Sequence, residues 1–438
     1  MPASSVVVAS EGSNRFVPAA SPEPPRDMTT TRPVAAPAVR CGFALLVGLA
    51  AFAVFFGPAM SSGVGRPDFY YLADAFLHGR PWLAQALSPW DVAIVGGRVY
   101  VPFAPFPAFV LAPLVAVLGP MSAATLEPIV NSLLAVAGLA LLWRLSGRLG
   151  VTSLTDRAWL LVLFGFSTST WWVTIRGGVW HTGQLVASIL TFAALLEAYG
   201  RRRAIVMGLL SGAGFLSRAT LLAALPYWAW RSLPEDVRAR LPSGLRIAAG
   251  VIARRAAWLA VGFAPALLFA LWYNAVRFGN PLESGYGLAA LVPFLEAHRE
   301  LGVFSLAHLG MNLDYFLWHL GQPIPDFPWF KPDGLGMSVF LTSPGLLLAV
   351  RADWHKRETV ALGITALLVL VPSLLYYGGG WYQFGYRYAL DAFPFVMALC
   401  AMAAARHGIG RWWKALIVIG VLVNLYGVYG LGRTDPVT

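Results

Sequence analysis

Runs of about 20 apolar residues recur along this chain, and the first of them covers residues 41–60. A helix of that length crosses the hydrocarbon core of a bilayer, which is about 30 Å thick. Of the 438 residues, 58% are hydrophobic and only 12% are charged, about half the charged fraction of soluble domains. The sequence therefore predicts an all-α polytopic membrane protein, because helices satisfy their own backbone hydrogen bonds inside a bilayer.

The net charge of +11 follows a pattern that orients a membrane protein, not one that binds nucleic acid. The Lys and Arg residues stand in short clusters between the apolar runs, whereas a nucleic-acid site needs them gathered on one face. With the N-terminus in the cytoplasm, most of the 32 Lys and Arg residues fall on the cytoplasmic side. We therefore expect a multi-pass protein with its N-terminus inside and no nucleic-acid partner.

In this orientation about eleven transmembrane helices alternate along residues 41–433. Residues 1–40 are rich in Pro, Ala and Ser without periodicity, so we expect a disordered cytoplasmic tail there, and residues 434–438 form a second, short tail. Residues 101–118 are apolar but hold four prolines. Because proline disfavours a regular crossing, we expect a re-entrant or surface-lying element in that segment.

Two long loops, residues 61–123 and 277–337, face outward in this topology. Both are longer than plain connectors, and long loops gathered on one side indicate recognition or chemistry at that face. In the first loop, Phe69, Leu72 and Phe76 recur at helical spacing. They predict a helix that lies on the membrane surface directly after the first span.

Asp68 begins this surface helix, at the boundary between water and lipid. Aspartate is a favoured helix N-cap, and a carboxylate at this boundary is also suited to act as a general base on a lipid-borne substrate. The two roles are compatible, so both stay open. Asp91, which follows Ser-Pro-Trp, is predicted to be a turn residue.

Two further groups of polar residues stand at the outer ends of apolar runs. Arg218, between two short runs, is either an interface anchor that extends toward water or a ligand for phosphate, whose geometry guanidinium groups match. Arg387 and Asp391 lie four residues apart and can pair with each other. With Trp381 and Tyr388 they form either an aromatic interface belt or the lining of a sugar or lipid-head site.

Arg176 and His181 flank the start of another outer-face helix and, with Trp180 and Gln184, make a polar mouth. A single histidine is more often a hydrogen-bonded structural residue than a catalyst. The two cysteines, at positions 41 and 400, lie in or beside apolar runs, and no spacing along the chain matches a metal site. The sequence alone thus assigns no metal ligand and no cofactor.

Three short motifs resemble those of polyprenyl-phosphate-sugar-dependent glycosyltransferases of the GT-C superfamily, in the branch of aminoarabinose transferases and protein O-mannosyltransferases. Residues 68–79, with Tyr71, resemble the D-x-x-Y-x-x-x-A-x-x-x-G start of the first outer loop in that branch. Residues 98–107, with Tyr100, resemble its Tyr-then-Pro-Pro element, and residues 215–220 resemble its basic turn. Later signatures resemble a bacterial subgroup of uncharacterised glycosyltransferase-like proteins.

The resemblance implies a GT-C-like bundle at residues 41–433 that transfers a sugar with inversion at the outer, periplasmic face of a bacterial plasma membrane. Asp68 would accept the proton of an acceptor hydroxyl, while Arg218 and Arg387 bind the departing polyprenyl phosphate. The implied partners are the lipid-linked sugar, a glycan, lipid or protein acceptor, and the bilayer. The implied substrate-lining residues are Tyr71, Tyr100, Arg176, His181, Trp381, Tyr388 and Asp391.

The chain also departs from this pattern. Many relatives carry a second carboxylate in the next outer loop, sometimes with a divalent metal, but residues 175–184 contain neither Asp nor Glu. Phe103 and Ala104 stand where a lysine often precedes the Pro-Pro element. A divalent metal therefore stays an open question, and two other functions remain as alternatives: a carrier for a lipid-linked sugar and a non-catalytic assembly partner. The scarcity of charge within the expected spans favours the enzyme.

Overall fold

The computed structural model describes residues 37–62, 65–240, 245–380 and 382–431. Most of the first expected tail, all of the second tail at 434–438, and Trp381 lie outside these residues. Residues 37–40, which the sequence places in the tail, form the first turn of helix α1 (Pro37–Ser62).

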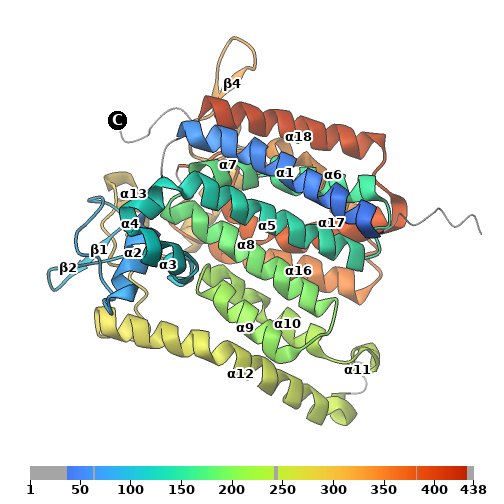
Figure 1. The fold of residues 1–438 in the computed structure, drawn as a ribbon, viewed down its shortest axis with the longest axis horizontal. Coiled ribbons are helices and arrows are strands. Elements are labelled where there is room, and N and C mark those ends of the chain that lie inside the picture. The colour runs from blue at the N-terminus through green and yellow to red at the C-terminus, as the bar shows by residue number, and fades with distance from the viewer. Residues whose placement is uncertain (1–36, 63–64, 241–244, 381, 432–438) are drawn as a thin grey trace, which may run out of the picture.

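The described chain is almost entirely helical, and its long helices run in one general direction (Figure 1). Six stretches are long and apolar enough to cross a membrane, and the bent pair α6 (Leu154–Phe166) and α7 (Thr170–Arg176), at 53°, makes up to seven. This confirms the all-α membrane class. The six lie in α1, α5 (Glu127–Arg148), α8 (Val179–Ala198), α12 (Leu245–Phe278), α16 (Arg357–Leu374) and α18 (Arg411–Gly430).

The eleven regular crossings are not seen, because several apolar runs fold as shorter pieces. Residues 338–350 divide into α15 (Val339–Thr342) and the 3-10 helix η4 (Pro344–Arg351). Residues 204–230 divide into α9 (Ala204–Phe215), η1 (Ala219–Ala224) and α10 (Leu225–Ser232). At the first break, Pro344 begins η4, a position that suits proline. At the second, the backbone of Arg218 is extended, with φ of −148° and ψ of 111°, so the helix cannot continue through it.

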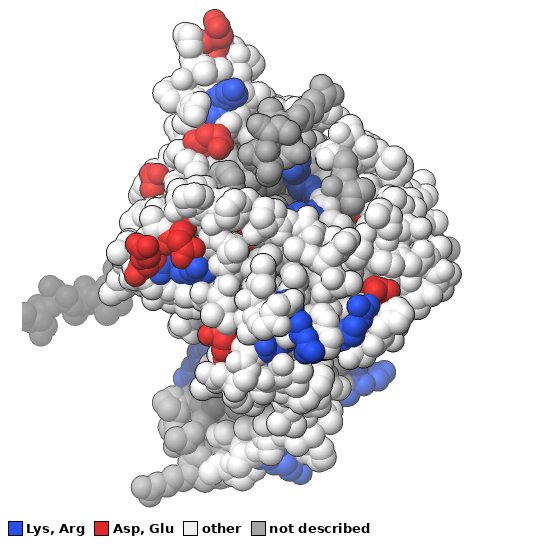
Figure 2. Space-filling view, turned by 90° about the vertical axis from the view of Figure 1, so that its left-hand side faces the viewer, with Lys and Arg blue, Asp and Glu red and all other residues white. Residues whose placement is uncertain are grey.

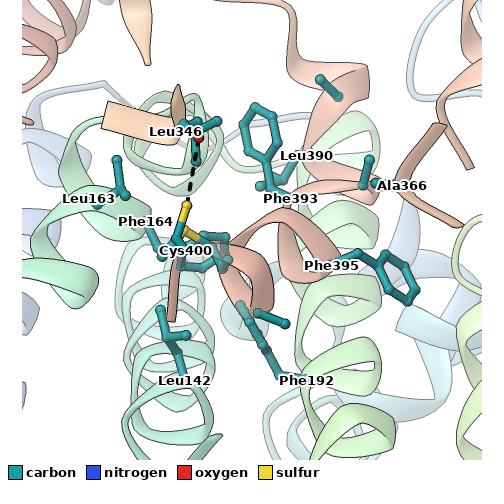
Figure 3. Close-up of a cluster of buried hydrophobic side chains, with 14 of the residues drawn as sticks. Leu142, Leu163, Phe164, Phe192, Leu346, Ala366, Leu390, Phe393, Phe395 and Cys400 are labelled. Atoms are coloured by element: carbon teal, nitrogen blue, oxygen red, sulfur yellow. Dashed lines mark hydrogen bonds between the residues drawn. The ribbon is translucent and has the colours of Figure 1, made fainter. Parts of the chain in front are cut away.

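Helix α17 (Phe393–His407) shows a second reason for the lower number, because its 15 residues are fewer than a regular crossing needs. Most of these residues are buried against the rest of the protein. Figure 3 shows Cys400 of this helix among Phe164, Phe192 and other apolar side chains, with its sulfur 3.7 Å from Leu346 O. Cys400 is thus the buried small residue that the sequence predicts, whereas the side chain of Cys41 lies outside the described residues.

One end of the bundle, at the left of Figure 1, carries the two long loops, and we call it the loop end. The helix predicted after the first span is present as α2 (Asp68–Leu77), packed on α3 (Phe106–Leu118). The first loop also holds a hairpin in which Ile94 pairs with Val99. The hairpin consists of β1 (Ala93–Val95) and β2 (Arg98–Tyr100), and the loop ends with α4 (Pro120–Thr125).

The second loop lies against the first, since Asp91 N donates to Ala290 O at 2.7 Å and Ala290 N donates to Val92 O at 2.9 Å. It too contains a hairpin, in which Gln322 pairs with Lys331. Its elements are α13 (Pro293–Arg299), η2 (Leu306–His308), α14 (Leu309–Leu313), the π-helical η3 (Asp314–Trp318), β3 (Gln322–Pro323) and β4 (Phe330–Lys331). The remaining elements of the chain are α11 (Glu235–Arg240) and η5 (Arg387–Asp391).

Candidate functional site

A cavity of about 90 Å³ lies at the loop end, where both loops meet the ends of α8, α9 and α16. Apolar and aromatic side chains form most of its wall, and two arginines supply its positive charge. The lining residues are Phe69, Phe103, Ala104, Val179, Trp180, Gly183, Ser217, Arg218, Ala219, Thr220, Tyr286, Phe304, Pro372, Ser373, Tyr376, Arg387 and Tyr388.

The two arginines share one aromatic ring. The Cζ atom of Arg218 lies 5.2 Å from the ring centroid of Tyr388, and that of Arg387 lies 4.6 Å from it. Each contact is a cation–π interaction, which holds a guanidinium group in place without neutralising its charge. The structure therefore brings together three of the residues that the sequence predicts for the site.

Arg218 is neutralised by a buried carboxylate. Its Nε donates to both oxygens of Asp391, at 2.9 and 3.2 Å, and Thr220 Oγ1 donates to Asp391 Oδ2 at 2.7 Å. The pairing of Asp391 with Arg387, one of the two interpretations from the sequence, is therefore wrong. Residues 387–391 form a 3-10 turn, with three residues per turn, so positions four apart do not face each other as they would in an α-helix.

In the described residues, the hydrogen bonds of the Arg387 guanidinium go to backbone oxygens. Its Nε donates to Gly380 O at 3.1 Å and its Nη1 to Trp180 O at 3.2 Å. In the described part of the chain, no carboxylate oxygen lies within 4 Å of this guanidinium. Two glutamines fix its backbone: Gln383 Oε1 accepts from Arg387 N, and Gln184 Nε2 donates to Arg387 O, both at 2.8 Å. No motif in the sequence singles out Gln383.

Asp68 is fully buried beside this cavity but does not line it. Its Oδ1 accepts from Arg66 Nη2 at 2.8 Å, and its Oδ2 has no hydrogen-bond partner among the described residues. The capping interpretation does not hold, because the helix begins at Asp68 itself and the N-cap position is Pro67, which makes no side-chain cap. Asp68 is joined to the cavity by its neighbour Phe69, which lines it.

Arg66 connects Asp68 to the cavity wall and to a second carboxylate. Its Cζ lies 5.2 Å from the ring centroid of Trp180, and its Nη1 lies 3.5 Å from Asp91 Oδ2. Burial raises the pKa of the Asp91 carboxyl, as does nearby Asp68, while the positive charges of Arg66 and, from farther away, Arg387 oppose the shift. The sequence predicts only a turn residue at Asp91, because the fold alone brings it to Arg66.

A divalent metal ion does not fit these residues. The guanidinium of Arg66 already contacts both carboxylates, at 2.8 Å for Asp68 and 3.5 Å for Asp91, and a cation there would repel it. Within the described ranges no group of three His, Cys, Asp or Glu side chains is placed to hold a metal.

Glu127, at the start of α5, ties the chain before Asp68 to the start of α8. Its Oε2 accepts from Gly65 N at 2.8 Å and its Oε1 from Gly178 N at 2.7 Å. The approach needs glycine, because a Cβ on Gly65 would lie 2.5 Å from Gly178 N, and Gly178 has φ of +78°. The sequence shows Glu127 only as a carboxylate near the end of a span, and its two partners are distant along the chain.

Two predicted lining tyrosines pack elsewhere. Tyr71 lies with its hydroxyl 4.0 Å from Met121 Sδ, in α4. Tyr100 packs its ring 5.5 Å from that of Phe278, at the end of α12. Neither is among the residues that line the cavity, and both instead pack within or against the first long loop.

Arg176 and His181 also lie outside the cavity lining. The Cζ of Arg176 lies 5.6 Å from the Trp172 ring centroid and 5.5 Å from that of Tyr382. His181 Nδ1 donates to Gly177 O at 2.6 Å, and its buried Nε2 has no partner in the described part of the chain. The histidine thus stabilises the turn at Gly177 and Gly178, which the hydrogen bond from Gly178 N to Glu127 also stabilises.

Neither a family model nor a curated protein matches this sequence. The structure is similar to the apo crystal structure of an oligosaccharyltransferase from Archaeoglobus fulgidus, at 13% identity and a TM-score of 0.48, over 90% of this chain and 55% of that one. The crystal structure of the same enzyme tethered to an acceptor peptide with the NVT sequon matches at 14% identity and a TM-score of 0.40, over 91% of this chain and 55% of that one. The present chain therefore spans about half the length of that enzyme, and similarity at this level carries no functional conclusion.

Proposed function

We propose that the protein is a membrane glycosyltransferase that moves a sugar from a polyprenyl-phosphate donor to an acceptor hydroxyl, with inversion. The observation that supports this most strongly is the cavity with Arg218 and Arg387 on one side and apolar walls elsewhere. Guanidinium groups match the geometry of a phosphate, and aromatic walls suit the first isoprene units of the lipid. The motifs at residues 68–79 and 215–220 support the same class.

The charge balance of the cavity favours Arg387 as the main phosphate ligand. Arg218 already has Asp391, whereas no carboxylate within 4 Å compensates Arg387 in the described residues. A buried, uncompensated cation is costly, and an anionic ligand removes that cost. The lipid phosphate thus binds Arg387 directly, with Arg218 held beside it through their shared contact with Tyr388.

Asp68 is the proposed general base. It takes the proton of the acceptor hydroxyl on its unpartnered Oδ2 while the hydroxyl oxygen forms a bond to the anomeric carbon. The bond from that carbon to the phosphate oxygen breaks, and the polyprenyl phosphate leaves with the electron pair toward the arginines. Because Asp68 is fully buried, this step requires the acceptor to open the wall formed by Phe69 and Trp180.

The distribution of charge favours a transferase over a carrier. In the six candidate spans, every Asp, Glu, Lys and Arg lies in the first or last two helical turns. A carrier that moves a charged lipid head across the bilayer needs polar groups along its path. A transferase needs them only at one end.

The proposal is tested in a strain of the source organism that lacks the gene. The sugar composition of the cell envelope is measured after complementation with the wild type or with Asp68→Asn at matched expression. We expect the wild type to restore a missing sugar, and Asp68→Asn to lose activity by about 10²–10⁴-fold with accumulation of the donor lipid. Restoration by both proteins would refute the catalytic role of Asp68 and favour a carrier or an assembly partner.

A further inference from the structure

The β3–β4 hairpin, residues 321–332, stands out sideways from the bundle. In Figure 1 it rises at the top, across the direction of α18, and in Figure 2, which looks onto the loop end, it again extends beyond the body of the protein. The β1–β2 hairpin extends in a different direction, along the axis of the long helices, at the left of Figure 1. Only the first of the two is thus placed to lie along a membrane surface.

The sideways hairpin exposes large aromatic side chains. Phe327 is 79% exposed and Trp329 is 65% exposed, and their rings lie 5.0 Å apart. Trp318 and Leu320, at the base of the hairpin, are exposed as well. Exposed apolar side chains gathered in this way mark a contact with a partner or with lipid.

The base of the hairpin is fixed to the end of a candidate span. Tyr426 Oη donates to Phe330 O at 3.0 Å, and the two rings meet edge to face at 5.3 Å. Tyr426 lies in the last two turns of α18, which ends at Gly430. His319 Nε2 and Asp333 Oδ2, 2.8 Å apart, close the base further. The hairpin is therefore held at the level of the C-terminal end of α18, one of the six candidate membrane spans.

The chemistry of the hairpin suits that level. Tryptophan and other aromatic residues are enriched where lipid headgroups meet hydrocarbon. Asp326 and Lys331, both exposed, would be costly inside the hydrocarbon but are accommodated among headgroups. The combination of aromatic and charged side chains fits the headgroup boundary better than either the bilayer interior or bulk water.

We propose that the β3–β4 hairpin is a lateral membrane anchor, which lies in the headgroup region beside the outer end of α18 with Phe327 and Trp329 inserted between lipids. The occupant of this surface is the bilayer and not a second protein. The anchor would hold the loop end at a fixed depth and tilt, independently of the reaction that the cavity performs.

The β1–β2 hairpin supplies a matched control. Ile94 on β1 is 61% exposed, close to the exposure of Trp329, but its hairpin extends along the helix axes and away from the bilayer. Trp329→Cys and Ile94→Cys are each made in a Cys41→Ala background and labelled with an environment-sensitive fluorophore. Cys400 is fully buried, and the Cys41→Ala parent measures any label that reaches it.

The labelled proteins are placed in phosphatidylcholine nanodiscs that contain lipids spin-labelled near the headgroup, and quenching is compared with that by aqueous iodide. We expect lipid quenching at position 329 to exceed that at 94 several-fold, and iodide quenching to show the reverse order. Phe327→Cys repeats the measurement at a second position. Equal lipid quenching at 329 and 94, or protection from iodide at 329 without lipid quenching, would overturn the proposal, the latter in favour of a protein partner.

Discussion

Arg231 and Arg387 are both deeply buried arginines, 2% and 3% exposed, but their surroundings differ. Arg231, at the end of the bundle opposite the loop end, has a carboxylate at 2.9 Å from Glu358 and donates to Ala198 O at 2.7 Å. Among the described residues, Arg387 donates hydrogen bonds to backbone oxygens and lies against the Tyr388 ring, with no carboxylate within 4 Å, and it lines the cavity. A buried cation therefore indicates a ligand site only where its charge is uncompensated and space lies beside it.

The difference predicts opposite consequences of substitution. The pair of Arg231 with Glu358 joins α10 to the start of α16, so it stabilises the fold and has no ligand to bind. The charge of Arg387 is available to a ligand, at a cost to the stability of the empty protein. Arg218 is intermediate, because it lines the cavity but is paired with Asp391.

The largest loss of stability is expected for Arg231→Met. The substitution removes the ion pair and leaves the oxygen of Ala198 without its donor, which costs about 3 kcal/mol, the lower end for buried pairs because Glu358 is partly exposed. Thermal unfolding in detergent measures the loss. Binding of a polyprenyl phosphate to the folded fraction should be unchanged. A loss of binding would contradict the conclusion that Arg231, unlike Arg387, has only a structural role.

Asp391→Asn should convert Arg218 into an uncompensated cation like Arg387. Without lipid, the variant loses about 2 kcal/mol, because a charged hydrogen-bonded group loses its partner. With undecaprenyl phosphate, the lipid replaces the lost carboxylate, so the ligand-induced rise in melting temperature should be greater than for the wild type. A rise equal to that of the wild type would show that Arg218 does not meet the phosphate.

Glu127→Gln should have a smaller effect, which reaches the site through the backbone. One of the two acceptors for Gly65 N and Gly178 N becomes an amide nitrogen, at a cost of about 1–2 kcal/mol. Because these bonds position the chain before Asp68, we expect activity to fall while lipid binding at Arg387 is kept. If activity and lipid binding were lost together, Glu127 would instead stabilise the whole cavity.

The smallest effect is expected from the pH dependence of stability at Asp91. Burial raises the pKa of this carboxyl in the folded protein, so the folded state binds a proton more readily than the unfolded state. Stability should therefore fall slightly as pH rises from about 4 through the raised pKa, and Asp91→Asn should remove this dependence. An unchanged pH profile in the variant would assign the dependence to another group.

Part of the fold and of the candidate site could be predicted from the sequence. Hydropathy and the spacing after Asp68 give the membrane class and α2, since both depend on local periodicity. The eleven expected crossings are not seen in the described residues, because some of the apolar runs fold as helices too short to cross, as α9 and α17 show. The two arginines of the cavity can be recognised from the sequence, because charged residues at the ends of apolar runs are costly and therefore rare.

The partners of these residues could not be predicted, because they come from distant segments. Asp391 and Arg218 are separated by 173 positions and Glu127 and Gly178 by 51. Asp91 has no motif of its own and meets Arg66 only once both loops are folded. Short-range pattern recognition therefore finds the charged groups but not which of them is compensated, and this second property separates Arg387 from Arg231.

The most direct test of the account is the binding of undecaprenyl phosphate to the purified protein in nanodiscs, with neutral undecaprenol as the control lipid. We predict that Arg387→Met weakens binding of the phosphate by about 10–100-fold, the contribution of a charge-assisted hydrogen bond, leaves undecaprenol binding nearly unchanged, and does not lower the melting temperature of the empty protein. Arg231→Met should bind the phosphate as the wild type does. Equal binding of the phosphate by the wild type and Arg387→Met would contradict the claim that the uncompensated arginine marks the donor site.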